Sequence, residues 1–366
     1  MKWTGVFLIV AGCLPAATVY DVVGLGGYGG NSAAANGIAA NGRTAGTGST
    51  PSGAQVAFAG GAGTGSATTL GANASAADVN SAGTVVGTSW DSGGPRATVW
   101  RAGIADAILG VDSYGLGINE AGDIAGSRLE GTQMQAFVQS GSSFTDIGIG
   151  GSTWSAAYDI NSSGGAAGYS MQQNGSFQAF VWDGAQGSRL LGTLGGGNSY
   201  AQALSDTGLV VGSSLTNASR LHAFVYDGVM RDLGTLGGSL SAAYDVNTAG
   251  QVVGYSMDGT GRSRAFVWLN GVMVDLNALV DAGSGWTLTA AYGINSTGQI
   301  VGEGTYYGQS TAFRLDPVQA AATGGLNLVS ADAEVPEPIG MAAVGLILLW
   351  LGSRRLRRQP PRDGVG

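Results

Sequence analysis

Short apolar segments alternate with turn sequences along most of the chain. Between residues 18 and 318 these segments are four to six residues long, are rich in Val, Ile, Phe, Tyr and Trp, and are separated by Asp-Gly, Asn-x-x-Gly or Gly-Gly. Apolar runs of this length and composition between such turns are typical of β-strands. One stretch predicts strands at residues 223–226, 230–233, 242–246 and 251–256. The pattern therefore predicts an all-β body.

One phrase of sequence recurs seven times in this body. Its form is Asp/Gly-Ile/Val-Asn-x-x-Gly-x-x-x-Gly, with five close copies and two looser ones at 37–46 and 203–212. A second phrase, Ala-Phe or a variant of it, follows each copy, and Leu-Gly-Thr-Leu-Gly-Gly is found in full or in part in some repeats. The closing glycines of the first phrase recur at a period of about 43 residues; they are residues 46, 87, 126, 168, 212, 254 and 302.

Four short strands in about 43 residues predict one blade of a β-propeller, so the chain is expected to form a seven-bladed propeller of four-stranded blades. A solenoid would also repeat, but it needs atypical capping units at its ends. Here the two ends of the repeat region complement each other instead. Residues 20–23 occupy the place of a second strand, and the strand that should precede them is found after the last repeat, at 312–315. We expect these two segments to pair and close the ring, which hides the sheet edges.

The composition excludes several other classes of protein. There are 67 glycines in 366 residues, well above the ordinary share of about 7%, but the 8 prolines and the lack of a three-residue period exclude collagen. With 44% apolar and 11% charged residues, the body is not of the disordered type. The net charge of the whole chain is −8, which makes nucleic acid an improbable partner. One cysteine and one histidine exclude a disulfide framework and a histidine metal cluster, and no cofactor or metal is expected.

The N-terminus has the pattern of a secretory signal peptide. Lys2 is followed by an apolar run over 5–14 and by two small residues, Ala16 and Ala17. Cleavage after Ala17 would leave a body without cysteine, as suits an exported protein without disulfides. The alternative is a lipobox at 10–13, Val-Ala-Gly-Cys, which would place a lipid on Cys13.

The C-terminus combines three features in a fixed order. Val335, Pro336, Glu337 and Pro338 precede an uncharged, mostly apolar run at 339–352, which is followed by a cluster of arginines at positions 354, 355, 357 and 358 (Arg354, Arg355, Arg357, Arg358). As a helix the run would span about 21 Å, short of a hydrocarbon core of about 30 Å, and snorkelling arginines would make up the difference. Positive flanks stay cytoplasmic, so the body is expected outside the inner membrane. A buried C-terminal helix would not end in four arginines.

The C-terminal features and the repeats each resemble a known family. The C-terminal features closely resemble the PEP-CTERM sorting signal of Gram-negative bacteria, which implies processing by signal peptidase and an exosortase, a transient stay in the inner membrane, and an exopolysaccharide-producing host. The repeats resemble the HAF extracellular repeat family, whose His-Ala-Phe triplet is present at residues 222–224. The expected organisation is a signal peptide at 1–17, the propeller at 18–318, a linker at 319–334, the sorting signal at 335–358 and a cytoplasmic tail at 359–366.

The residues that suggest chemistry have structural explanations. His222 occupies a position that holds Gln, Arg or Thr in other repeats, so a solvated strand position is expected. Residues 159–164 resemble the start of a calcium loop, but position 170 is serine where an EF-hand needs glutamate, and an Asx-type turn accounts for the same residues. A glycosidase needs two carboxylates with separated pKa values in one cleft, whereas most acids here recur with the repeat. We therefore expect no catalytic residue.

Four aromatic residues are candidates for binding a glycan. They are Tyr114, Trp154, Tyr200 and Trp286, each between a predicted second strand and the next Asn-Gly phrase. Equivalent loops of a propeller emerge on one end of the ring, where flat rings suit stacking on sugars; the alternative is that these rings fill gaps between glycine-rich blades. The resemblance of the C-terminus to the sorting signal implies a non-enzymatic surface or matrix protein that acts in adhesion or scaffolding within a polysaccharide layer. The alternative is a carbohydrate-active enzyme, a glycosidase or lyase, on the same scaffold.

Overall fold

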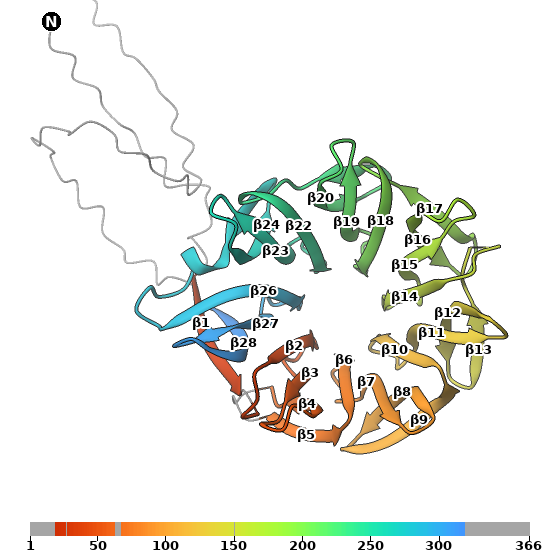
Figure 1. The fold of residues 1–366 in the computed structure, drawn as a ribbon, viewed down its shortest axis with the longest axis horizontal. Coiled ribbons are helices and arrows are strands. Elements are labelled where there is room, and N and C mark those ends of the chain that lie inside the picture. Colours follow the sequence, from red (N-terminus) through yellow and green to blue (C-terminus); the bar gives the residue numbers. More distant parts are fainter. Residues whose placement is uncertain (1–18, 27, 63–66, 150, 319–366) are drawn as a thin grey trace, which may run out of the picture. The chain divides into compact units, whose positions relative to one another are not determined.

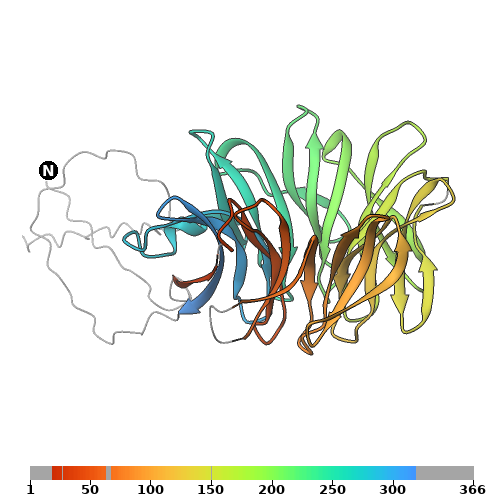
Figure 2. The same ribbon diagram turned by 60° about the horizontal axis from the view of Figure 1, so that its bottom comes forward.

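Seven antiparallel sheets of four strands each surround a central axis, as the views in Figure 1 and Figure 2 show. The computed structural model describes residues 19–26, 28–62, 67–149 and 151–318. Within each of the first six sheets the strands follow the order of the sequence, from the axis outward. The prediction of an all-β, seven-bladed propeller with four-stranded blades is confirmed.

The first six blades take four consecutive strands each, and a short 3-10 helix η1 (Leu276–Ala278) follows blade 6. Blade 1 contains β2 (Ala33–Ile38), β3 (Thr44–Ser49), β4 (Gln55–Gly60) and β5 (Ala67–Ala72), and blade 2 contains β6 (Ala74–Val79), β7 (Val85–Asp91), β8 (Gly94–Arg101) and β9 (Ile104–Val111). Blade 3 contains β10 (Ser113–Ile118), β11 (Ile124–Glu130), β12 (Gln133–Ser140) and β13 (Ser143–Asp146), and blade 4 contains β14 (Ser155–Ile160), β15 (Ala166–Met171), β16 (Phe177–Asp183) and β17 (Gly187–Gly192). Blade 5 contains β18 (Gly195–Leu204), β19 (Val210–Thr216), β20 (Leu221–Tyr226) and β21 (Met230–Asp232), and blade 6 contains β22 (Gly237–Val246), β23 (Val252–Asp258), β24 (Ser263–Leu269) and β25 (Val272–Asp275).

Blade 7 joins the two ends of the repeat region. It contains β26 (Trp286–Ile294), β27 (Ile300–Tyr306), β28 (Gln309–Val318) and, as its outer strand, β1 (Val19–Gly26), drawn in red beside the blue β28 in Figure 1. The register pairs Val22 with Leu315, so the predicted pairing that closes the ring is confirmed. Arg314 of β28 is buried and adds a link to blade 1, because it donates to the carbonyl of Ala62 at 3.1 Å while two of its nitrogens hold the carboxylate of Asp316 at 2.9 Å.

The boundary between blades differs from the sequence-based expectation. The strands predicted within 223–256 were expected to form one blade, but β20 and β21 are the outer pair of blade 5, whereas β22 and β23 are the inner pair of blade 6. The connection from β21 to β22 is as short as a hairpin turn, so no gap in the sequence marks the boundary. The repeat unit therefore spans two blades.

The repeated phrases build the packing between strands. The phenylalanine of the Ala-Phe phrase is completely buried in six blades, at residues 58, 137, 180, 224, 266 and 313. Each inner strand has a β-bulge where it pairs with the second strand, for example between Ala157 and Asp159 of β14. The closing glycine faces this bulge: a Cβ on Gly168 would overlap the carbonyl oxygen of Ala156. Glycine is required there because the bulged strand occupies the space of a side chain.

The predicted signal peptide, linker, sorting signal and tail lie outside the described residues and stay predictions. Within the described residues, no helix is long and apolar enough to cross a membrane.

Candidate functional site

The asparagine of the repeated phrase forms hydrogen bonds in two directions. In blade 4 the Oδ1 atom of Asn161 accepts the backbone N–H of Gly165 at 2.9 Å, and its Nδ2 donates to the carbonyl of Ser205 in the next blade at 3.3 Å. The inter-blade bond is repeated by the asparagines at 80, 119, 247 and 295. The turn predicted at this phrase is confirmed, and its side chain also holds neighbouring blades together.

The contacts between the asparagine turns show that the inner strands of neighbouring blades run in the same direction along the axis. Each turn follows an inner strand and contacts the turn of the next blade, so the turns gather at one end of the axis. The segments that precede the inner strands lie toward the other end. Of the four aromatic candidates, Trp154 lies just before β14, Tyr114 and Trp286 lie at the start of β10 and β26, and Tyr200 lies in the middle of β18.

An aspartate two residues before the asparagine forms a second set of links between blades. Asp78, Asp159 and Asp245 occupy this position in blades 2, 4 and 6, while blades 1, 3, 5 and 7 have Gly37, Gly117, Ala203 and Gly293. The carboxylate of Asp245 accepts the N–H of Val246 and, across the blade boundary, that of Ile294, both at 2.7 Å. Asp78 and Asp159 do the same toward blades 3 and 5. Small residues alternate with them because a Cβ on Gly37 would lie 2.5 Å from Asp78 Oδ1.

The three aspartates line a cavity of about 370 Å³ at the axis, together with Tyr158, Tyr244 and other inner-strand residues. Burial is the main cause that raises the pKa of Asp78 to about 7, of Asp159 to about 6 and of Asp245 to about 8. Repulsion by Asp159 adds to the shifts of the other two. The carboxyls therefore take up protons close to neutral pH, although backbone N–H groups already occupy both oxygens of each.

Two of the aromatic candidates meet in one cluster between blades 4 and 5. The ring of Trp154 is stacked on Tyr169 with centroids 5.3 Å apart and meets Phe177 edge-on at 5.7 Å. Tyr200 contacts the same two rings, at 4.9 and 5.8 Å. Tyr114 of β10 is half-buried and lies in another blade, outside this cluster. Trp154 and Tyr200 thus have the contacts expected if these rings fill gaps between glycine-rich blades, which was the alternative to glycan binding.

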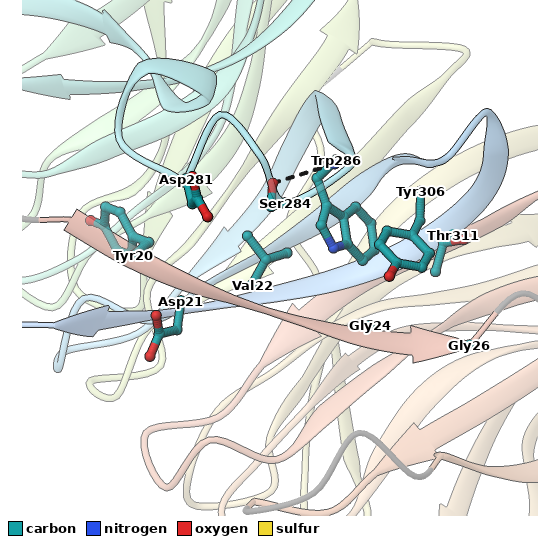
Figure 3. Close-up of a pocket in the computed structure, with 10 residues that line it drawn as sticks. All are labelled: Tyr20, Asp21, Val22, Gly24, Gly26, Asp281, Ser284, Trp286, Tyr306 and Thr311. Atoms are coloured by element: carbon teal, nitrogen blue, oxygen red, sulfur yellow. Dashed lines mark hydrogen bonds between the residues drawn. The ribbon is translucent and has the colours of Figure 1, made fainter.

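Trp286 lies apart from them, in an open pocket of about 570 Å³ beside the closing strand (Figure 3). We name this the seam pocket, and its lining residues are Tyr20, Asp21, Val22, Gly24, Gly26, Asp281, Ser284, Trp286, Tyr306 and Thr311. The Trp286 ring lies beside the Tyr306 ring, with centroids 5.2 Å apart and planes at 38°. Its edge is held by the buried Phe313, 6.2 Å away. The volume is in the range of small-molecule sites, about 300–1,000 Å³.

The sequence pattern identified only one of these pocket residues, Trp286. Tyr306 and Thr311 come from β27 and β28, and Tyr20 to Gly26 come from β1 at the other end of the repeat region. The sequence feature that could have located the pocket is the predicted pairing of the two ends of the repeat region, because it places β1 beside residues 312–315. Asp21 and Asp281 both border the pocket, but their side chains lie on opposite sides of β1 (Figure 3).

His222 is less solvated than expected. Its side chain is 18% exposed, and its Nδ1 lies 2.8 Å from the carboxylate of Asp232 on the adjacent strand β21. The cause is the contact with Asp232 on the neighbouring strand; the sequence predicted that strand but not this contact. Among the residues that the structure describes, no three His, Cys, Asp or Glu side chains are close enough to hold a metal ion.

Comparison with solved structures identifies other propellers. The chain is similar to a puromycin-hydrolysing peptidase of Mycobacterium tuberculosis, with a TM-score of 0.53 and 11% identity over 84% of this chain and 56% of the peptidase. It is also similar to the β-propeller domain of the trilobed protease of Pyrococcus furiosus (TM-score 0.47, 13% identity, 64% of this chain and 80% of that one) and to TolB of Acinetobacter baumannii (0.44, 13%, 76% and 64%). The chain thus spans less than two thirds of the peptidase and of TolB.

At these identities the likeness shows the fold alone. No protein-family model matches the sequence, and no curated protein matches it either. The resemblances to HAF repeats and to the PEP-CTERM signal therefore stay predictions.

Proposed function

We propose that the chain is an exported, non-enzymatic protein of the cell surface or extracellular matrix, which acts in adhesion or scaffolding within an exopolysaccharide layer. The observation that carries this proposal is the use of the acidic side chains. Asp78, Asp159 and Asp245 recur with the repeat and accept backbone N–H groups of the next blade. Other acids pair with nearby arginines, as Asp146 does with Arg128. Acidic side chains whose hydrogen bonds hold neighbouring blades together suit a rigid scaffold.

Export and sorting rest on the two ends of the sequence. In this proposal signal peptidase removes residues 1–17, and an exosortase cleaves at or near residues 335–338 and removes the arginine cluster. The body would be held at the inner membrane only until this step. Mass spectrometry of protein extracted from the surface of an exosortase-containing host should find chains that end near residue 338. Surface-extracted protein that keeps Arg354 to Arg358 would contradict the sorting step.

A carbohydrate-active enzyme is the second candidate, and a specific observation favours it. Asp281 lines the pocket that holds Trp286 and Tyr306, and Asp21 borders it from the other side of β1 (Figure 3). Most glycosidases use two carboxyl groups. The two functions differ in what happens to the polysaccharide. We expect the full-length chain to be retained on the host polysaccharide without shortening it. New reducing ends or unsaturated products, lost in Asp281→Asn, would establish the enzyme and contradict the scaffold.

A further inference from the structure

We propose that the seam pocket binds one sugar residue of a neutral or amino-sugar polysaccharide, stacked on Trp286 and Tyr306 and bordered by Tyr307. This inference rests on the proposed function and names the site and the ligand class for it. It is independent of the axial cavity, whose carboxyls already bond to backbone N–H groups.

The rim of the pocket exposes more aromatic surface than the fold requires. Tyr306 is 43% exposed and Tyr307 is 72% exposed, and their ring centroids are 4.6 Å apart. Beside them the Trp286 indole is only partly buried. Three neighbouring aromatic rings that face solvent form the kind of surface that marks a binding site, because large amphipathic rings supply contact area and accept stacking on apolar C–H faces.

Tyr307 is also unfavourable for the local backbone. Tyr307 lies in the β27–β28 hairpin turn with a φ of 45°, and Gly308 follows with a φ of 82°. Two positive φ values in sequence are typical of a hairpin turn that prefers Asn-Gly, and a bulky residue at the first position is an outlier. Its ring packs over Gly285, where a Cβ would lie only 2.6 Å from Tyr307 Cζ. The tyrosine therefore costs stability and stays exposed, which points to a contact outside the chain.

The polar groups of the pocket select the class of sugar. The carboxylate of Asp281 can accept hydrogen bonds from hydroxyl or ammonium groups, and the hydroxyls of Ser284 and Thr311 can donate or accept. The Asp21 side chain points to the opposite side of β1 from Val22 and Trp286 (Figure 3). Of the ten described residues that line the pocket, none is cationic. A uronic acid would bring its carboxylate toward that of Asp281 with no cation to pair with it. The pocket therefore suits neutral sugars and amino sugars and disfavours uronic acids.

The position of the pocket links binding to closure of the ring. Five of its ten lining residues belong to β1, and the others come from the segment before β26, from the start of β26 and from β27 and β28. The indole of Trp286 lies over β1 at Gly24, where a Cβ would be 3.4 Å from the ring. A sugar held between these elements contacts both ends of the propeller at once. Because the complete pocket exists only in the closed ring, the ligand should raise the melting temperature.

The test measures retention of the full-length chain in affinity electrophoresis on gels that contain a neutral glucan, chitosan or a polyuronate. Tyr307→Asn is the informative variant, because asparagine suits the turn: its melting temperature should equal or exceed that of the parent chain, while retention falls about 5- to 10-fold, as expected for one lost stacking contact. Trp286→Ala should lose more retention. Ala102→Asn, a change at another positive-φ hairpin residue (φ 49°), is the matched control and should keep full retention.

Each result has a defined meaning. Equal retention of Tyr307→Asn, Trp286→Ala and the parent chain would overturn the seam pocket as the site while leaving polysaccharide binding intact. Strongest retention on the polyuronate would overturn the ligand class. If the parent chain is retained on none of the three gels, the inference fails, and the surface role is then judged separately by the mass spectrometry of surface-extracted protein.

Discussion

Raising the pH from about 5 to about 9 should destabilise the propeller, and replacing Asp245 by asparagine should remove much of that pH dependence. Burial raises the pKa of Asp245 from 3.8 to about 8, with repulsion by Asp159 as a second cause. At pH values between 3.8 and about 8, the folded ring binds more protons than the unfolded chain. The free energy of unfolding therefore falls as the pH rises through this window and is lowest above pH 8.

The size of the effect follows from the pKa shift. One pKa unit corresponds to about 1.4 kcal/mol. The unfolded carboxyl is already ionised at pH 5, so only the interval from pH 5 to the folded pKa of about 8 contributes, and Asp245 sets an upper limit of about 4 kcal/mol over the tested range. The three carboxyls repel one another and lose their protons in sequence, so removing one of them relieves the other two in part. For Asp245→Asn we expect the loss between pH 5 and pH 9 to shrink by about 2–3 kcal/mol.

Asparagine also has a cost that does not depend on pH. Asp245 accepts two N–H groups, from Val246 and Ile294, whereas an amide presents one oxygen and one NH₂ group. One N–H would then face a donor, which should cost about 1–3 kcal/mol at pH 5. The variant is therefore expected to be less stable than the parent chain in acid and to approach or exceed it above pH 8.

The assay is urea denaturation of the full-length chain, followed by tryptophan fluorescence at a series of pH values. Asp106→Asn is the control, because the Asp106 side chain is 71% exposed and lies far out on β9; it should keep the pH dependence of the parent chain. The reasoning is refuted if Asp245→Asn also keeps that dependence, or if the parent chain is more stable at pH 9 than at pH 5.

Three further predictions concern the repeated phrases and the closure of the ring. Gly168→Ala should lower the free energy of unfolding by about 3 kcal/mol or more, since its Cβ would overlap a carbonyl oxygen of the inner strand, while Gly197→Ala, which has open space, should leave the melting temperature nearly unchanged. Asn295→Ala should cost about 1–3 kcal/mol in urea denaturation, because it removes the bond to blade 1 and the bonds within its own turn. Deleting residues 19–26 should lower the melting temperature of the whole ring, since β28 loses its outer partner; an unchanged melting curve would contradict the closure.

Much of the fold could be predicted because the repeat carries it. The spacing of the closing glycines predicts seven units, and the complementary ends at 20–23 and 312–315 predict the pairing of β1 with β28. The blade boundary could not be predicted in the same way. A repeat period has no natural starting point, and the turn between β21 and β22 has the same glycine-rich character as the turns within a blade.

The roles of the repeated polar residues were only partly predictable. The sequence indicates that Asn161 makes a turn, but the bond from its Nδ2 to Ser205 crosses to the next blade, and such contacts depend on how the blades stack. The alternation of aspartate with glycine or alanine before this asparagine is visible in the sequence. The reason for the alternation is steric and is seen only in the structure, where a side chain at Gly37 would collide with Asp78 of the next blade.

The candidate site shows the same limit. Spacing along the chain grouped Tyr114, Trp154, Tyr200 and Trp286 by their place before the repeated phrase. In the structure Trp154 and Tyr200 share one cluster, Tyr114 lies outside it, and Trp286 joins residues from β1, β27 and β28. A ring of equivalent positions predicts the end of the propeller on which a side chain lies. It does not predict which strands of other blades lie against it.

The most direct test of the proposed polysaccharide-binding role is a crystal structure of the full-length chain soaked with an oligosaccharide from the polymer that retains it best. We expect density for an intact glycosidic chain with one sugar ring parallel to the Trp286 indole, next to Tyr306 and Tyr307, and with hydroxyl or ammonium groups facing Asp281. Density in the axial cavity instead, or a cleaved oligosaccharide next to Asp281, would contradict the account.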